Sequence, residues 1–230
     1  MEWRSTGCLP TPPISLQMAA NIQAGGAAIN VLGRAAGASV RVVDVSLDHD
    51  VWGDERVSRS CGSIDREDAM DDDQVIRSLQ IGQRVADQEV DSGVDLLIAG
   101  DLGIGNTTPA AALIGAMTST EPVVVVGRGT GIDDEGWKRK VTAVRDAMYR
   151  VRAIKHDPIA VLKAISSPDL AAMAGFLAQA AVRRTPVLLD GVVVTSAALM
   201  ANKLAPGARK WWVAGHKGAE PAHILALNSL

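Results

Sequence analysis

The sequence predicts an α/β protein with a doubly wound, mainly parallel sheet. Short apolar runs alternate along the chain with longer helical patterns, and several of these runs end directly in glycine, aspartate or histidine. The apolar residues are mostly Ala, Val, Leu and Ile, with only one Phe and one Tyr, a composition that suits helices packed on a buried parallel sheet. Because ligands of such sheets bind beyond the carboxyl ends of the strands, we expect a site along one edge.

The length predicts the domain organisation. A chain of 230 residues buries one sizeable core, so we expect residues 14–230 to form a single α/β domain. Residues 1–13 contain three prolines and no periodicity, and we expect them to be an irregular N-terminal arm.

The first half of the chain contains two helical patterns, each followed by an apolar run. Residues 14–36 read as a helix rich in small residues, and residues 38–45 (ASVRVVDV) as a strand that ends in acid. A polar stretch then leads to an amphipathic helix over residues 73–91 and a short strand over residues 94–99 (VDLLIA).

The segment after that strand is the strongest local sign of a binding site. Residues 100–109 (GDLGIGNTTP) carry three glycines and lead into an Ala-rich helix over residues 110–117. Glycines let an anion approach backbone N–H groups, and the start of a helix favours negative charge. The segment has neither the Gly-Lys-Ser/Thr ending of a Walker loop nor the spacing of a dinucleotide fingerprint. It indicates a phosphate or carboxylate ligand.

Three further strands are expected at residues 122–126, 186–189 and 210–214. The first is followed by the glycine loop 127–131, the second by Asp190 and Gly191, and the third by Gly215 and His216. Polar groups after each strand are therefore expected to meet at the same edge of the sheet.

Several of these residues have two readings. Lys138 and Arg139 are expected on the solvated face of the helix after the second glycine loop, whereas Lys140 begins an inward-facing apolar stripe. For Asp190, contact with a ribose hydroxyl and capping of the next helix are equally compatible with the sequence. For His216, contact with an anion or packing is expected.

No metal or cofactor is expected. The nearest partner for His216 at ligand spacing is His223, seven residues on, which does not make a metal site. Cys61 has no neighbour that would lower its pKa and is expected to be a buried small residue and not a nucleophile.

Charge and hydropathy exclude several classes of partner. The formal net charge is -3 with acidic and basic residues interleaved, so nucleic acid and anionic lipid are not expected as partners. No apolar run reaches the roughly 18 to 20 residues of a membrane span. With only Cys8 and Cys61 and no secretory pattern, we expect a cytoplasmic location.

Five long segments, in order from about Gln17 to the last residue, carry a family resemblance. They are QMAANIQAGGAAINVL, GDLGIGNTTPAAAL, VGRGTGIDDEGWKRKVTAVRDAM, DLAAMAGFLAQAAVRRTPVLLDGVVVTSAAL and GHKGAEPAHILAL. Together they resemble the nicotinate-nucleotide:dimethylbenzimidazole phosphoribosyltransferase family, which makes the lower-ligand nucleotide of cobalamin. The resemblance implies a Rossmann-like sheet, a smaller lobe built from both chain ends, and a homodimer whose neighbouring subunit helps to close the site.

The resemblance also implies an activity. A benzimidazole nitrogen attacks the anomeric carbon of nicotinate mononucleotide, nicotinate leaves, and α-ribazole 5'-phosphate forms. The pyridinium nitrogen is already cationic, so this chemistry needs an anion cradle, positioning of the aromatic acceptor and a base, without a metal or cofactor.

Site residues follow from the resemblance by position. Asp101 is implied as an electrostatic partner near the ribose or the reacting ring, and Lys140 as the site lysine; these are the expected catalytic residues. Gln17 and Met18 are implied at the border of the benzimidazole pocket. The substrate-binding residues implied are Gly103, Gly105, Asn106, Thr107, Gly129, Gly131, Asp190, Gly191, His216, Gln17 and Met18.

The sequence also departs from the family pattern. The Arg-Leu-Gly-Glu-Gly motif whose glutamate is the family's general base does not occur in these 230 residues, nor do the initial Lys-Pro-x-Gly-Ser-Leu-Gly and Asp-His-Gly segments. We therefore expect a chain truncated at both ends, with most of the small lobe missing.

The leading hypothesis is an enzyme that transfers phosphoribosyl from nicotinate mononucleotide to 5,6-dimethylbenzimidazole. The alternative is a non-catalytic or split-partner nucleotide-binding module of the same family that lacks the general base. A Rossmann-type dehydrogenase is disfavoured because the dinucleotide spacing is absent.

Overall fold

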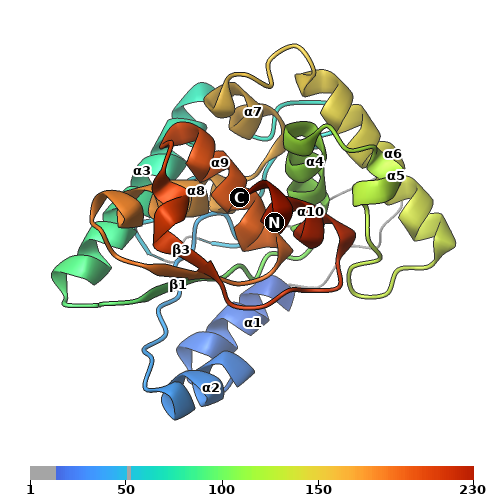
Figure 1. The fold of residues 1–230 in the computed structure, drawn as a ribbon. Coiled ribbons are helices and arrows are strands. Elements are labelled where there is room, and N and C mark those ends of the chain that lie inside the picture. The colour runs from blue at the N-terminus through green and yellow to red at the C-terminus, as the bar shows by residue number, and fades with distance from the viewer. Residues whose placement is uncertain (1–13, 51–52) are drawn as a thin grey trace.

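The computed structural model describes residues 14–50 and 53–230, and it confirms the α/β class with a parallel, open sheet. The strands pair in the order β1-β2-β3 and both pairs are parallel. The strands are β1 (Leu97–Ala99), β2 (Val187–Leu189) and β3 (Trp212–Ala214). Each is only three residues long, so most of the described chain is helix and loop (Figure 1).

Ten α-helices and one 3₁₀-helix are found in the described part of the chain. They are α1 (Ile14–Gln23), α2 (Ala28–Ala36), α3 (Asp72–Asp91), α4 (Thr107–Thr118), α5 (Pro122–Val125), α6 (Asp134–Val151), α7 (Pro158–Ile165), α8 (Pro168–Val182), α9 (Val192–Leu204), the 3₁₀-helix (Ala208–Trp211) and α10 (Pro221–Ser229). The expected helices over 73–91 and 110–117 are confirmed as α3 and α4. No helix of this part is long and apolar enough to cross a membrane.

The sheet is covered on one face. Leu97 and Ala99 of β1 point into the core, whereas Ile98 between them is exposed, as alternation along a strand requires. On the covered side, α3, α8 and α9 form a helical layer, and α1 and α2 project from the opposite side as an arm (Figure 1).

Helices α3 and α8 touch backbone to backbone. A Cβ atom on Gly82 of α3 would overlap the carbonyl of Ala172, and a Cβ atom on Gly175 of α8 would overlap the carbonyl of Leu79. Glycine at these two positions therefore lets the two helices approach more closely than any other residue would allow.

The prediction of a strand over residues 38–45 is wrong. This segment is extended but joins no sheet in the described residues, and side chains hold it in place. Arg41 binds Glu89 of α3, and the buried carboxylate of Asp44 pairs with the guanidinium of Arg56, whose Nε lies 2.9 Å from Asp44 Oδ2. The β-prone composition of the segment finds no ladder partner, and these side-chain contacts replace one.

The prediction of a strand over residues 122–126 is also wrong, because residues 122–125 form the single helical turn α5. Pro122 occupies the first helical position, where its fixed φ favours a helix and its missing N–H costs nothing. Val123 and Val124 are exposed, so the apolar run is not a buried strand.

The other boundary differences are smaller. The strands expected over 94–99 and 186–189 begin only at Leu97 and Val187. The single helix expected over 14–36 is divided into α1 and α2 by a turn in which Gly25 has a φ of +79°. The strand expected over 210–214 begins only at Trp212, because Lys210 and Trp211 belong to the 3₁₀-helix.

Candidate functional site

The loops that follow the three strands lie next to one another. Since β1, β2 and β3 run parallel, their carboxyl ends share one edge, and the Gly215 N–H donates to the Leu189 carbonyl across two of these ends, at 2.9 Å. No atom of residues 14–50 or 53–230 lies within 4 Å of the place where a Cβ would stand on Gly100, directly after β1, or on Gly191, near the end of β2. As far as these residues go, the edge has room for a ligand.

The first glycine loop is organised around Asp101. Its Oδ1 accepts the Gly103 N–H at 3.0 Å, and its Oδ2 accepts the Asn106 amide at 2.7 Å. Gly105 takes a φ of +86°, a left-handed conformation that turns the chain into α4. Because the amide of Asn106 donates to Asp101, Asn106 makes no side-chain cap on α4. The Thr108 N–H donates to the Gly105 carbonyl and Pro109 has no N–H, so an anion at this helix start would meet the N–H of Thr107.

Burial raises the pKa of Asp101 to about 7, and the charge of Asp169 at the start of α8 adds to this effect. The bonds from Gly103 and Asn106 act in the opposite direction because they stabilise the carboxylate. Asp101 thus changes charge near neutral pH, as perturbed acids at functional sites often do. Sequence reasoning missed Asp169, and no local signal connects it with a residue so far back along the chain.

The second glycine loop, residues 127–131, leads into α6. Asp133 caps that helix by accepting the Gly136 N–H at 2.7 Å. Gly129 and Gly131 take φ values of +55° and +101°, so both positions favour glycine. The Trp137 indole donates to the Val126 carbonyl at 2.9 Å and fixes the start of the loop.

Lys140 joins the two loops. Its Nζ donates to Thr107 Oγ1 at 2.9 Å, and the side chain, predicted to face inward, is only 7% exposed. Burial lowers the pKa of Lys140, and the charge of Glu220 opposes this shift. On the same helix Lys138 is exposed and pairs with Glu135, as its predicted solvated position implies.

Glu220 reaches the second loop from the start of α10. Its Oε1 accepts the Gly129 N–H at 3.0 Å, and Gly127 leaves the space in which its carboxylate lies. Sequence reasoning gave Glu220 no role. The only local signal is an acid followed by Pro221 after the glycine-histidine turn. That pattern predicts a helix start and does not predict a contact with a residue 91 positions away.

The third group contains Asp190 and His216. His216 Nδ1 lies 3.7 Å from Asp190 Oδ1, and its ring meets the ring of buried His223 edge to face, with centroids 5.4 Å apart. The Gly218 N–H donates to His223 Nδ1 at 3.0 Å, which places the proton of the neutral ring on Nε2. Burial, and then the neighbouring His216, lower the pKa of His223, with Asp190 acting against them, so the ring is neutral at pH 7.

Two expected site residues stand apart. Gln17 and Met18 lie on the exposed side of α1, and no hydrogen bond described for residues 14–50 links Gln17 to the glycine loops.

Cys61 is partly buried against the core, and burial raises its pKa to about 12, so its thiol is protonated. In the described residues no three His, Cys, Asp or Glu side chains group as metal ligands.

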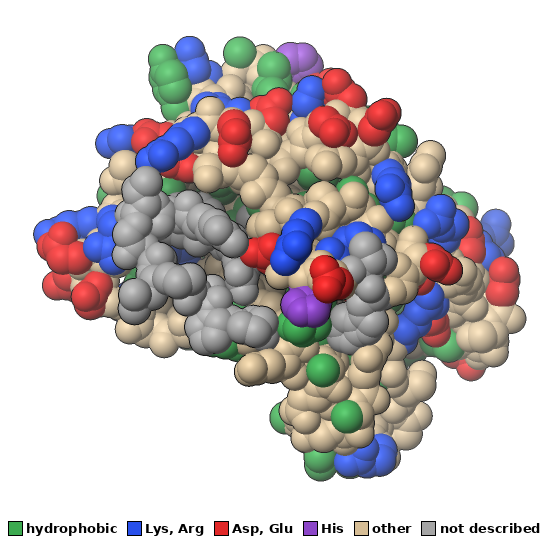
Figure 2. Space-filling view, turned by 180° about the vertical axis from the view of Figure 1, so that it is seen from behind, with side chains coloured by type: hydrophobic (Ala, Val, Ile, Leu, Met, Phe, Trp, Pro, Cys, Tyr) green, Lys and Arg blue, Asp and Glu red, His purple; other side chains and the backbone are tan. Residues whose placement is uncertain are grey.

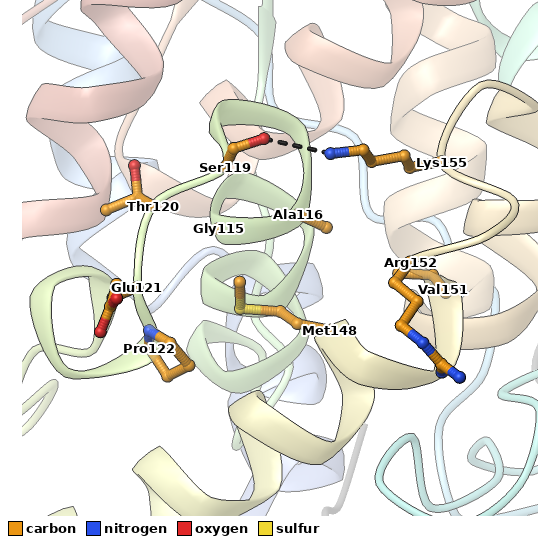
Figure 3. A pocket seen from close by; sticks show the side chains of 10 residues that line it. All are labelled: Gly115, Ala116, Ser119, Thr120, Glu121, Pro122, Met148, Val151, Arg152 and Lys155. Carbon is orange, nitrogen blue, oxygen red and sulfur yellow. Dashed lines mark hydrogen bonds between the residues drawn. The ribbon is translucent and has the colours of Figure 1, made fainter.

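A separate hollow of about 320 Å³ lies between α4, α5 and α6 (Figure 3). Glu121, Arg152 and Lys155 border it, and Lys155 Nζ donates to Ser119 Oγ at 3.2 Å. None of the expected site residues lines this hollow.

On the face drawn in Figure 2, acidic and basic side chains are intermixed, and there is no broad basic surface of the kind that binds nucleic acid.

The arrangement can hold an anion and position a neighbouring ring or sugar. Two glycine turns, a helix start, a buried ammonium and a hydroxyl converge at Lys140 and Thr107. Carboxylates at Asp101 and Asp190 flank this point along the sheet edge, where they are suited to contact ribose hydroxyls or a cationic ring.

Comparison with known proteins gives the same family in each case. The family model described as phosphoribosyltransferase matches residues 9–230. A protein of Corynebacterium glutamicum (strain R) named nicotinate-nucleotide–dimethylbenzimidazole phosphoribosyltransferase is 72% identical over 217 residues, which cover 94% of this chain and 61% of that protein. A protein of the same name from Mycobacterium marinum is 58% identical over 223 residues, covering 95% of this chain and 62% of its own length.

The fold agrees with a solved structure. The crystal structure of CobT from Thermus thermophilus superposes with a TM-score of 0.87 at 37% identity, covering 96% of this chain and 68% of that one. The chain spans about three fifths of the length of the curated relatives it matches.

Proposed function

Since the chain belongs to the phosphoribosyltransferase family, we propose that it binds nicotinate mononucleotide and serves the transfer of its phosphoribosyl group to 5,6-dimethylbenzimidazole. The observation that carries the proposal is the bond from buried Lys140 to Thr107, which brings the two glycine loops into one anion cradle. The named activity of the 72% identical relative supplies the substrates. The products are α-ribazole 5'-phosphate and nicotinate, in cobalamin assembly.

The nucleotide phosphate is assigned to the cradle. Lys140 supplies the positive charge, Thr107 a hydroxyl and Gly129 a backbone N–H, as oxyanions require. Gly131 contributes through its left-handed turn, because its own N–H donates to the Arg128 carbonyl at 3.0 Å. Gly103 and Gly105 shape the first loop so that the phosphate can approach the start of α4.

The rest of the nucleotide is assigned to the carboxylates of the sheet edge. Asp101 faces the ribose or the cationic pyridinium ring, and Asn106 orients Asp101 through its amide. Asp190, with Gly191 and His216, takes the ribose side beyond β2. These side chains position the anomeric carbon for attack by the benzimidazole nitrogen, while nicotinate leaves as a neutral ring nitrogen without a general acid. The N–H proton of the attacking benzimidazole passes to a base, the role that the resemblance gives to a glutamate in a motif that does not occur in these 230 residues.

The acceptor side and the assembly complete the proposal. Gln17 and Met18 on α1 border the benzimidazole, and the exposed apolar residues of α2, Leu32 at 65% exposure among them, pack on a second copy in a homodimer. The free thiol of Cys61 agrees with a cytoplasmic location.

A coupled assay tests the function. Nicotinate release and α-ribazole phosphate formation are measured with both substrates, alongside calorimetric titration of nicotinate mononucleotide alone. Lys140→Met is expected to lower the affinity for the nucleotide, and the exposed Lys138→Met on the same helix serves as the control. Failure of the wild-type chain to bind nicotinate mononucleotide would refute the proposal.

A further inference from the structure

Glu220 occupies the position at which an anion would meet the second glycine loop. Its carboxylate accepts the Gly129 N–H, at 3.0 Å, and it leaves its own helix uncapped, since no side-chain bond runs from Glu220 to the start of α10. Glu220 thus fills an anion-binding position at a backbone N–H that lies 91 residues earlier in the chain. We call this position, at the Gly129 N–H, the seat.

The charge of the seat is matched to this carboxylate. Gly129 has no side chain, and a Cβ atom there would lie 3.7 Å from Lys140 Nζ and 3.6 Å from Thr107 Oγ1. The negative charge of Glu220 acts on Lys140 in the direction that favours the ammonium. The Glu220 carboxylate and the Lys140 ammonium thus both approach Gly129, the first at its N–H and the second on its side-chain face.

The loop is built to admit Glu220. Any side chain on Gly127 would overlap its carboxylate, so the absence of a Cβ at this position creates the space. Glu220 is only half-buried, however, and the side chain has a path to solvent. A bound group with this exposure can leave without unfolding the surrounding helices.

We infer that Glu220 is a built-in competitor for the phosphate seat, and that a phosphate-bearing ligand must displace its carboxylate from the Gly129 N–H. This inference rests on the proposed function for the identity of the nucleotide, and on the contacts above for the seat itself. A phosphate dianion offers more charge and more acceptor oxygens than one carboxylate, so it takes over the lysine when it binds. The association constant of the wild-type chain then equals that of the open site multiplied by the fraction of molecules in which Glu220 has left the seat.

The test compares two Glu-Pro helix starts. Glu220→Gln removes the charge with little change in side-chain size. Its neutral amide gives up the Gly129 N–H to a phosphate more readily than the carboxylate does, because hydrogen bonds to charged acceptors are the stronger ones. Glu121 also precedes a proline at a helix start and makes no side-chain cap, and it lies outside the cradle; Glu121→Gln is the matched control for the change of net charge. Inorganic phosphate and nicotinate mononucleotide are titrated separately by calorimetry into both variants and the wild type.

Competition predicts that Glu220→Gln binds both ligands about tenfold more tightly, as expected if the seat is free one tenth of the time, while Glu121→Gln matches the wild type. Unchanged or weaker binding of both ligands by Glu220→Gln would overturn the inference while leaving the proposed function standing. Tighter phosphate binding by Glu220→Gln, with no nucleotide binding by any form, would support the competitor and refute the proposed substrate.

Discussion

Asp101 and Lys140 are ionisable side chains that are largely buried, and burial shifts their pKa values in opposite directions. It raises the pKa of the carboxyl to about 7 and lowers the pKa of the ammonium, in each case against the charged form. A nucleotide that carries both an anionic phosphate and a cationic ring restores the charged form of each. We therefore expect binding and ionisation to be coupled at both residues.

The pH dependence of binding tests Asp101. Below pH 7 the carboxyl is mainly protonated, and above it the carboxylate is free to attract the pyridinium ring, so nucleotide affinity should rise as pH increases through about 7. If the ring lowers this pKa by one unit, binding to the charged form is about tenfold tighter. Dissociation constants at pH 6, 7 and 8 give the measurement. Asp101→Asn should lose the part of the pH dependence that comes from the carboxyl group and keep the part that comes from ionisation of the phosphate. Identical pH profiles for both proteins would contradict the assignment.

The buried pair of Asp44 and Arg56 tests the loop that replaced an expected strand. The Asp44 side chain is 1% exposed and its partner 9%, so Arg56→Ala leaves a carboxylate in the interior without compensation. The expected loss is about 3–5 kcal/mol in the free energy of unfolding. Arg59 pairs with Asp48 at the surface, and Arg59→Ala should cost no more than about 1 kcal/mol. Urea denaturation compares them, and equal losses would mean that the buried pair does not hold this loop.

At the scale of elements, sequence reasoning succeeded where the signal is local. The helix over residues 73–91 has its own apolar stripe and capping acid, and α3 forms there with Asp71 accepting the Gln74 N–H. The prediction from sequence failed where contacts between distant segments, or a proline, determine the secondary structure. Residues 38–45 have the composition of a strand without a ladder partner, and Pro122 turned a run of valines into a helical turn.

The contact between α3 and α8 depends on two glycines. Gly82→Ala or Gly175→Ala places a methyl group against the carbonyl of the facing helix, and the helices must separate. The free energy of unfolding should fall by about 1–3 kcal/mol or more. Gly115→Ala in α4 is the control, because its new methyl would meet the movable end of Met148. Thermal unfolding provides the comparison, and a loss in the control equal to that in Gly82→Ala would contradict the backbone contact.

At the scale of the whole molecule, the described fold leaves apolar surface uncovered. One face of the sheet exposes Ile98 of β1 and Val213 of β3, and α2 exposes Ile29 and Leu32, which are three residues apart on the helix. These exposed apolar side chains are the physical basis for the proposed dimer.

Self-association is therefore expected. Sedimentation equilibrium should detect a dimer at tens of micromolar protein, and Leu32→Lys should shift the equilibrium toward monomer by placing a charge in the contact. Ile76 is an exposed apolar residue on α3, away from the arm, and Ile76→Lys should leave the association unchanged. A wild-type chain that remains monomeric throughout would exclude this surface as a dimer contact.

The site itself was predictable only in part. The glycine loops, Asp101, Lys140 and Asp190 follow apolar runs or an inward stripe, and the sequence pattern placed them at one edge. Two further interactions at the site join distant segments: Glu220 accepts the Gly129 N–H, and the charge of Asp169 acts on Asp101. No periodicity encodes such pairs, since they arise only when α8 and α10 are packed.

The central claim is that two glycine loops and Lys140 form one phosphate cradle for nicotinate mononucleotide. Calorimetric titration of this nucleotide into the wild type, Lys140→Met and Lys138→Met tests it most directly. The account predicts saturable binding in the micromolar to millimolar range typical of enzyme substrates, at least tenfold weaker in Lys140→Met and unchanged in Lys138→Met. Equal affinity of all three proteins, or no binding by the wild type, would contradict it.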